Sequence, residues 1–502
     1  MSIQGNWGRR MSRKKFLTAG GLGAAALALG STEALARPGN GGGGSAGFGP
    51  LKEDKAGILD LPKGFQYRIV SEQGTNLSSG KPVPGDHDGM AAFQGPGNTT
   101  ILVRNHELSP GDLAGDDAPV VGENPYDPAQ PGGTTGIVIG PNRKEVRDYV
   151  TSSGTNRNCS GGPTPWGTWI TCEETRIPAG TSDTNTAHGY CFEVLPDGSQ
   201  TLSDEPITDM GFFSHEAIGV DPRTGIAYLT EDDFRGNIPD DPNEEVEGTS
   251  RSSFLYRFIP NARNLGPGAY QKGGKLQALS IEERPNYNAD LARQGQSFGV
   301  VWRDVRPEFA SEDALAKDCA RFNRLEGADF SGGAFWFDDT AGGEERLGQI
   351  WRYIPATETL ELFFEGQDAN NMQSPDNLVV APFGDVWFCE DGSGTDRIMG
   401  VTPEGEVYEF ARNRLNDSEL AGCTFAPDGK TFFVNIQNPG LTFVIWGPFG
   451  RVNRSRQRQM AFSAPPAGLG PNVSGELAEA AEKNGLSTLE AAGYERLGVS
   501  LA

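Results

Sequence analysis

Short runs of β-branched and aromatic residues recur along the chain, and each of them ends in acidic residues. Runs of this composition, bounded by glycine and proline, predict β-strands. If the strands are equivalent elements of a repeated fold, their acidic ends meet in one place. The five runs with this pattern are residues 99–107, 167–174, 225–233, 333–339 and 384–391.

Carboxylates held close together in this way need protons or multivalent cations between them. Two unit charges about 4 Å apart repel by about 4 kcal/mol at an effective dielectric constant of about 20. The acidic strand ends therefore predict a metal cluster.

A second polar marker precedes each acidic end by one tight hairpin, and hairpins of outer strands lie between these units. An inner hairpin followed by an outer hairpin is typical of a β-propeller blade, whose inner strand lines a central channel. Six inner hairpins predict an all-β, six-bladed β-propeller with elaborated loops, particularly at 234–320. The six markers begin at Asp88, Asn158, Ser214, Leu325, Pro375 and Ala421.

The composition agrees with this fold and excludes one class of partner. The 502 residues include 69 glycines and 34 prolines, which punctuate the short strands. The formal net charge of −24 argues against nucleic acid as a partner. Helical periodicity is confined to the C-terminal part, where residues 466–502 are predicted to form a short helical extension.

The N-terminus has the features of an export signal. Basic residues at 9–15 precede an apolar stretch at 19–30 that is too short for a stable membrane span, and Ala34-Leu35-Ala36 is similar to a cleavage site. Ser12-Arg-Lys-Lys-Phe-Leu17 resembles a twin-arginine (Tat) signal, with Lys14 where the second arginine usually stands. We therefore expect a periplasmic or extracellular protein. Its expected parts are a signal peptide at 1–36, a flexible glycine-rich leader at 37–50 and a propeller domain at 51–465.

Cys172, beside Glu173 and Glu174, is the most distinctive candidate metal ligand. Oxygen-rich sites suit hard ions such as Ca²⁺, whereas a thiolate among carboxylates admits iron or zinc. An arbitrary cysteine is more often a small buried hydrophobic residue, but the position of Cys172 where a strand meets acid favours ligation. Cys389 has the analogous position before Glu390, although strand alternation is expected to turn its side chain into the sheet.

His106 and His215 each precede a glutamate. Because neighbouring residues on a strand point to opposite faces, we expect Glu107 and Glu216, rather than the histidines, to be metal ligands. The chain has no H-E-x-x-H, C-x-x-C, P-loop or G-x-S-x-G motif, so nucleophilic serine or cysteine catalysis has no motif support.

Several of these segments resemble the signature segments of PhoX-type alkaline phosphatases. The longest is Pro163-Thr-Pro-Trp-Gly-Thr-Trp-Ile-Thr-Cys-Glu-Glu174, and the resemblance runs from about residue 55 to residue 450. Arg324-Leu-Glu-Gly327 departs from the expected Arg-Pro-Glu-Gly. The other matching segments are 105–107, 214–217, 228–233, 375–377 and 388–392.

The resemblance implies an exported six-bladed propeller that hydrolyses phosphate monoesters at an iron–calcium cluster. Cys172 is then the implied iron-bridging thiolate. Cys172, Glu173 and Arg397 are the expected catalytic residues, and Arg397 and Arg352 are candidates to hold the phosphate. We expect small phosphate esters and the Tat export machinery as partners, and a monomer. The expected metal ligands are Glu107, Cys172, Glu173, Glu216, Glu231, Asp232, Glu326, Asp376 and Glu390.

Two other functions fit an acidic channel. A calcium-dependent propeller hydrolase such as a lactonase would use similar carboxylates but needs no thiolate. A non-catalytic calcium-binding propeller, used for surface binding, needs neither a thiolate nor open coordination positions. A sulfur ligand therefore separates the phosphatase hypothesis from both alternatives.

Overall fold

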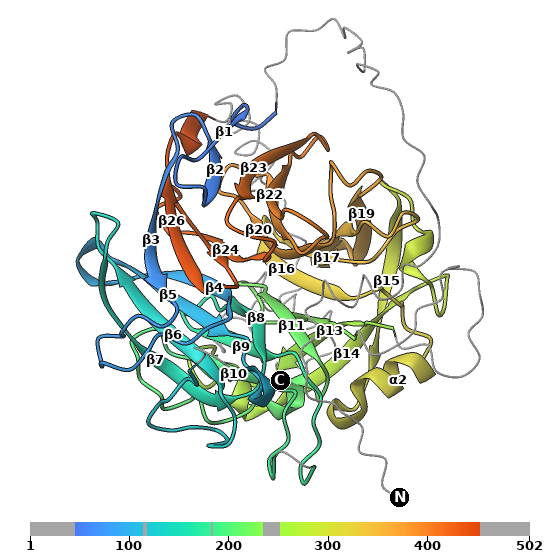
Figure 1. The fold of residues 1–502 in the computed structure, drawn as a ribbon. Coiled ribbons are helices and arrows are strands. Elements are labelled where there is room, and N and C mark those ends of the chain that lie inside the picture. The colour runs from blue at the N-terminus through green and yellow to red at the C-terminus, as the bar shows by residue number, and fades with distance from the viewer. Residues whose placement is uncertain (1–45, 114–117, 182–183, 234–251, 452–502) are drawn as a thin grey trace, which may run out of the picture.

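The computed structural model describes residues 46–113, 118–181, 184–233 and 252–451, almost all of them in β-strands and loops (Figure 1). The predicted signal peptide and C-terminal extension lie outside these residues. Within them, no helix is long and apolar enough to cross a membrane. The helices are α2 (Ala310–Ala316) and the 3-10 turns η1 (Pro96–Asn98), η2 (Pro110–Asp112), η3 (Thr208–Met210), η4 (Tyr270–Lys272), η5 (Ala289–Leu291), η6 (Pro307–Phe309), η7 (Pro355–Thr357) and η8 (Phe449–Arg451).

Three of the sheets are small antiparallel meanders. The first contains β4 (His87–Gln94), β5 (Thr100–His106), β6 (Gly132–Ile139) and β7 (Glu145–Thr155). The second contains β8 (Asn158–Pro163), β9 (Trp169–Glu173) and β10 (Cys191–Val194). The third contains β24 (Leu420–Phe425), β25 (Thr431–Ile436), β26 (Leu441–Trp446) and β3 (Gln66–Glu72), so an early strand completes the last sheet.

Two further sheets are larger. One has the order β20 (Pro375–Val380), β21 (Val386–Glu390), β22 (Arg397–Val401), β23 (Val407–Asn413), β2 (Leu59–Pro62) and β1 (Leu51–Lys52). The other joins two meanders into nine strands through the pairing of β15 with β19. Its strands are β11 (His215–Val220), β12 (Ala227–Glu231), β13 (Leu255–Pro260), β14 (Gly274–Ile281), β15 (Ser297–Asp304), β19 (Thr359–Glu365), β18 (Gln349–Ile354), β17 (Ala334–Asp339) and β16 (Leu325–Ser331).

The first strand of each meander faces the centre of the molecule. In the order β4, β8, β11, β16, β20 and β24, each of these strands contacts the next, and β24 contacts β4 (Figure 1). The fold is therefore all-β and propeller-like, as the sequence predicts. The sheets do not separate cleanly into six blades, because two meanders share the nine-stranded sheet.

Aromatic side chains fill the space between the sheets. The fully buried Trp387 packs against Phe410 and Phe432, with ring centroids 4.2 and 5.1 Å away. Phe48, which falls in the predicted leader, packs against Phe65 of the same cluster at 5.0 Å. Burying one such side chain stabilises the fold by about 1.5–3 kcal/mol. This packing holds neighbouring sheets together around the ring of inner strands.

All six innermost strands carry the same irregularity near their first residue. In each, three steps along the inner strand are opposed by two steps along its partner, which defines a β-bulge. A bulge re-aims side chains that regular alternation would turn away. The two bulged residues are Asp88-Gly89, Cys159-Ser160, Glu216-Ala217, Glu326-Gly327, Asp376-Asn377 and Gly422-Cys423.

Candidate metal centre

Two sets of donor side chains meet at the end of the channel where these bulges lie. The first set occupies the first bulge position of four inner strands: Cys159, Glu216, Glu326 and Asp376. The second set directly follows the last residue of the paired strands β9, β12 and β21: Glu174, Asp232 and Asp391. Repetition of one hairpin therefore places chemically similar side chains around one axis.

The donor atoms lie within 4.8 Å of one another in four overlapping groups among the described residues. Because each group shares a member with another, they form one connected arrangement, which we call the donor cluster. Every member is buried, and Asp391 is the most exposed of them at 9%. The groups are Cys159, Glu174 and Glu216; Glu174, Asp232 and Glu326; Glu216, Glu326 and Asp376; and Asp376, Asp391 and Glu419.

Two arginines enter the donor cluster from its edge. Arg324 bridges Asp232 and Glu326, with Nη2 2.7 and 2.6 Å from their carboxylate oxygens. Arg157 bridges Glu107 and Glu174, with Nε 3.2 and 2.9 Å away. The exposed fractions of the two side chains are 19% and 28%, so both guanidinium groups border solvent. They compensate part of the acidic charge and leave most of it for other cations.

Burial makes the ionised forms of the cluster costly. It raises the pKa of Asp232 to about 6, although Arg324 opposes the shift. It also raises the pKa of the Cys159 thiol well above its usual value, with Glu216 and Glu174 adding to the effect. A bound metal ion reverses this preference, because thiolate and carboxylate are the forms that coordinate. One thiol among carboxylates is a donor set that admits iron or zinc beside a hard ion such as calcium.

Four of the expected metal ligands belong to the donor cluster: Glu216, Asp232, Glu326 and Asp376. Glu107 lies at its edge, bonded to Arg157 and, at 2.7 Å, to the amide of Gln437. The cluster also contains Cys159, Glu174, Asp391 and Glu419, which were not among the expected ligands.

Three expected ligands lie one position before cluster residues, and their carboxylates bind other parts of the fold. Glu173 accepts hydrogen bonds from the backbone N–H groups of Asn156, Gly189 and Tyr190 and contacts His188. Glu231 accepts from Ser311, Tyr256 and the Phe254 N–H, and Glu390 accepts from Arg397 and the Gln373 N–H. Burial raises the pKa of Glu231 and of Glu390 to about 7, although these hydrogen bonds oppose the shift.

The remaining expected catalytic residues, and the second candidate for phosphate binding, are also bonded elsewhere. The Cys172 sulfur lies 3.8 Å from that of Cys191, its direct partner across β9 and β10. Arg397 donates to Glu390 and to the carbonyls of Ala369 and Asn370. Arg352, on the outer strand β18, pairs with Glu361 at 2.6 Å.

Comparison with solved structures finds related folds. The chain is similar to Pseudomonas fluorescens PhoX in complex with vanadate, a transition state analogue, with a TM-score of 0.59 and 18% identity over 78% of this chain and 97% of that one. It is also similar to the gluconolactonase XC5397 from Xanthomonas campestris, with a TM-score of 0.40 and 14% identity over 80% of this chain and 98% of that one.

Comparison with curated proteins finds no match. The family model described as alkaline phosphatase PhoX matches residues 46–440, which include every member of the donor cluster. The chain belongs to the PhoX family of alkaline phosphatases.

Proposed function

We propose that the chain is an exported phosphomonoesterase that acts at an iron–calcium cluster. The observation that carries the proposal is the donor cluster itself, in which one thiol and seven carboxylates are connected at one end of the channel. Family membership supports phosphate esters as substrates. The vanadate bound by the Pseudomonas fluorescens relative, a transition state analogue, agrees with that substrate class.

The donor set suggests how the metals would be distributed. The group that contains the thiol, Cys159 with Glu174 and Glu216, suits iron, because thiolate is a soft ligand that hard cations do not favour. The all-oxygen group of Asp376, Asp391 and Glu419 suits calcium. We therefore assign the sulfur ligand to Cys159 rather than to Cys172. A calcium-only lactonase or binding protein has no use for a thiolate in this position.

The arginines at the edge supply the contacts to the phosphate. When bound, the metal ions stabilise the charge of the phosphoryl group and activate the nucleophile. Arg324 is held rigidly by Asp232 and Glu326, so its planar guanidinium is presented to the mouth in one orientation. We assign phosphate binding to Arg324, and we assign to Arg397 the orientation of Glu390.

The finer features of the fold and of export belong to the same proposal. We propose six blades, with the nine-stranded sheet counted as two that join at β15 and β19, and a catalytic domain at 51–465. Tat-dependent export of a monomer would carry a folded protein with its thiols reduced, and all six cysteines are free. Replacing the basic residues at 9–15 and locating the protein by cell fractionation tests the export signal.

Paired cysteine substitutions test the proposed function. Protein purified without chelator and supplied with iron and calcium is expected to contain both metals and to hydrolyse p-nitrophenyl phosphate. Cys159→Ser is expected to lose iron and at least about 100-fold in kcat/KM, the scale on which single catalytic groups act. The matched Cys172→Ser variant is expected to keep both.

The outcomes discriminate between the hypotheses. Loss of iron in Cys172→Ser alone would return the sulfur ligand to position 172. A wild-type protein that binds calcium without iron and shows no turnover would reject the phosphatase proposal. Hydrolysis of a lactone by that protein would support the alternative enzyme.

A further inference from the structure

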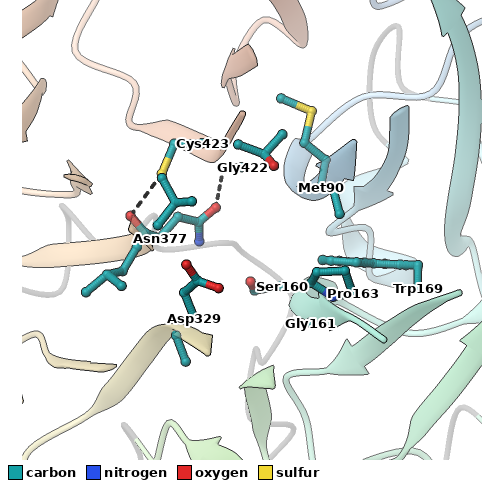
Figure 2. A pocket seen from close by; sticks show the side chains of 14 residues that line it. Met90, Ser160, Gly161, Pro163, Trp169, Asp329, Asn377, Gly422 and Cys423 are labelled. Atoms are coloured by element: carbon teal, nitrogen blue, oxygen red, sulfur yellow. Dashed lines mark hydrogen bonds between the residues drawn. The ribbon is translucent and has the colours of Figure 1, made fainter. Parts of the chain in front are cut away.

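A cavity of about 100 Å³ lies among the inner strands, and two of its lining residues, Ser160 and Asn377, are chain neighbours of donor-cluster members. Its wall includes the second bulge residues Ser160, Asn377 and Cys423, which directly follow first bulge residues in the chain (Figure 2). A water molecule takes up about 30 Å³ of the liquid, so the cavity has room for about three water-sized groups. The cavity, which we call the chamber, is thus connected to the donor cluster along the chain.

One carboxylate projects into this chamber. Asp329, on β16, points toward the space that the Ser160 hydroxyl also faces (Figure 2). Its Oδ2 accepts the backbone N–H of Val380 at 2.9 Å. Among the described residues, no lysine, arginine or histidine forms an ion pair with Asp329. The carboxylate therefore lacks a protein counter-charge there.

The polar side chain on the opposite wall, Asn377, already forms hydrogen bonds within the protein. The Asn377 amide nitrogen donates to Asp376 Oδ1 at 3.0 Å, and its oxygen accepts the N–H of Gly422. Burial raises the pKa of Asp329 to about 6, so the group is still mostly ionised at neutral and alkaline pH. Asp329 is half-buried, and a carboxylate in a partly desolvated position is stabilised by an opposite charge nearby. A cation in the chamber would supply that charge.

We propose that the chamber binds one hydrated divalent cation of magnesium size, held by the Asp329 carboxylate and the Ser160 hydroxyl. Magnesium keeps several of its waters and is bound through one or two carboxylates, whereas calcium takes six to eight oxygen ligands. One carboxylate, one hydroxyl and space for about three waters fit the smaller ion. Neither residue belongs to the donor cluster, so this site is separate from the proposed catalytic metals and does not depend on the phosphatase function.

Manganese provides a probe for the site, because it prefers the same oxygen ligands and has an anomalous X-ray signal. Crystals of the metal-loaded protein soaked in MnCl₂ are expected to show an anomalous peak about 2.1 Å from the Asp329 carboxylate. Asp329→Asn keeps the size of the side chain and an oxygen that can accept the Val380 N–H. This variant is expected to lose the peak, and Ser160→Ala is expected to weaken it.

The donor cluster serves as an internal reference, because its peaks should be equal in all variants. Asp417→Asn, at an exposed position, controls for the change of charge. Counting bound manganese by electron paramagnetic resonance gives a second measurement, with one ion fewer per chain expected in Asp329→Asn. A chamber filled only with water, or an unchanged peak and count in Asp329→Asn, would overturn the proposal.

Discussion

Replacing Glu173 by glutamine distinguishes a metal ligand from a structural carboxylate at a position that the sequence assigned to the metal site. Oε1 of Glu173 accepts the Asn156 N–H at 2.8 Å and lies 2.7 Å from His188 Nδ1. Oε2 accepts the N–H groups of Gly189 and Tyr190 at 2.8 and 3.2 Å. Both oxygens are therefore occupied by the protein, and we expect Glu173→Gln to alter stability rather than metal binding.

The size of the effect follows from these four contacts. Glutamine offers one oxygen, so its NH₂ must face one of the two pairs of donors. In the milder arrangement a neutral His188 accepts from the new NH₂, and only the Asn156 N–H is left without an acceptor. That costs about 1–3 kcal/mol, and weakening of the remaining charge-assisted bonds adds about 1 kcal/mol. We expect the free energy of unfolding to fall by about 2–4 kcal/mol.

The assay pairs urea unfolding with metal analysis on the same preparations. Glu193→Gln is the matched structural control, because buried Glu193 also accepts several donors, from Trp166, Thr168 and the Gly268 N–H. Glu174→Gln is the matched cluster variant. We expect Glu173→Gln and Glu193→Gln to lose stability and keep their full metal content, and Glu174→Gln to lose metal. A Glu173→Gln variant that keeps its stability and loses metal would refute the assignment.

Three further substitutions test Arg324 at the edge of the donor cluster, His188 beside Glu173, and the bulge residue Gly327. Arg324→Lys removes the planar guanidinium group that lies between Asp232 and Glu326. The KM for p-nitrophenyl phosphate is expected to rise about tenfold, equivalent to about 1.4 kcal/mol. An unchanged KM in steady-state kinetics would argue against phosphate binding by Arg324. Burial lowers the pKa of His188, but its bonds to Glu173 and Asp127 outweigh this and raise the pKa above the usual value of about 6.5. The stability advantage of the wild type over His188→Gln should therefore be full below about pH 6.5 and disappear as the pH rises through the folded-state pKa, and urea unfolding that shows the opposite trend would contradict this. Gly327→Ala would push a methyl group into the backbone of Asp376 and Leu378. Thermal unfolding should therefore show a fall of about 1–3 kcal/mol in the free energy of unfolding, and metal analysis a lower metal content. Unchanged stability and metal content would mean that β16 and β20 can move apart to make room for the methyl group.

The fold was largely predictable because the signal was repeated. Alternating apolar runs and turns occur in every unit, and acidic strand ends in five of the six, so the inner and outer hairpins could be recognised without any single strong motif. Pairing between strands far apart in the chain carried no local signal. The joining of β15 to β19, which merges two meanders, pairs Ser297–Gly299 with Thr359–Glu361, and such contacts are set by tertiary packing.

The expected ligands lie in the same region as the donor cluster, but several of them stand one residue before its members. Glu173, Glu231 and Glu390 end their strands, and Glu174, Asp232 and Asp391 follow them. Because side chains alternate between the two faces of a strand, a shift of one residue sends a side chain to the other face. A pair of adjacent acids does not reveal which member faces the channel. That choice depends on where the strand ends, which sequence patterns locate least reliably.

Cys159, the sulfur donor of the cluster, was not among the expected ligands, although the repeat contained the information. Cys159, Glu216, Glu326 and Asp376 all stand at the same step of the marker, two residues before a small or apolar residue that resumes the regular strand. Aligning the markers therefore places Cys159 among three carboxylates, whereas Cys172 aligns with strand residues inside the sheet. The sequence does not show the bulge. With regular alternation, either of the two bulge residues could face the donor cluster. The extra residue of the bulge is what turns Cys159 toward the donor cluster and Ser160 toward the cavity.

The sixth bulge has Gly422 in place of a donor, with φ of +65° and its N–H bonded to Asn377. The ring of donors is therefore open on that side. Asp391 and Glu419 complete the cluster there from the strand ends instead. The same hairpin, with Gly422 in one copy and with Asp88 of another outside the four groups, thus accounts for both the connected cluster and its asymmetry.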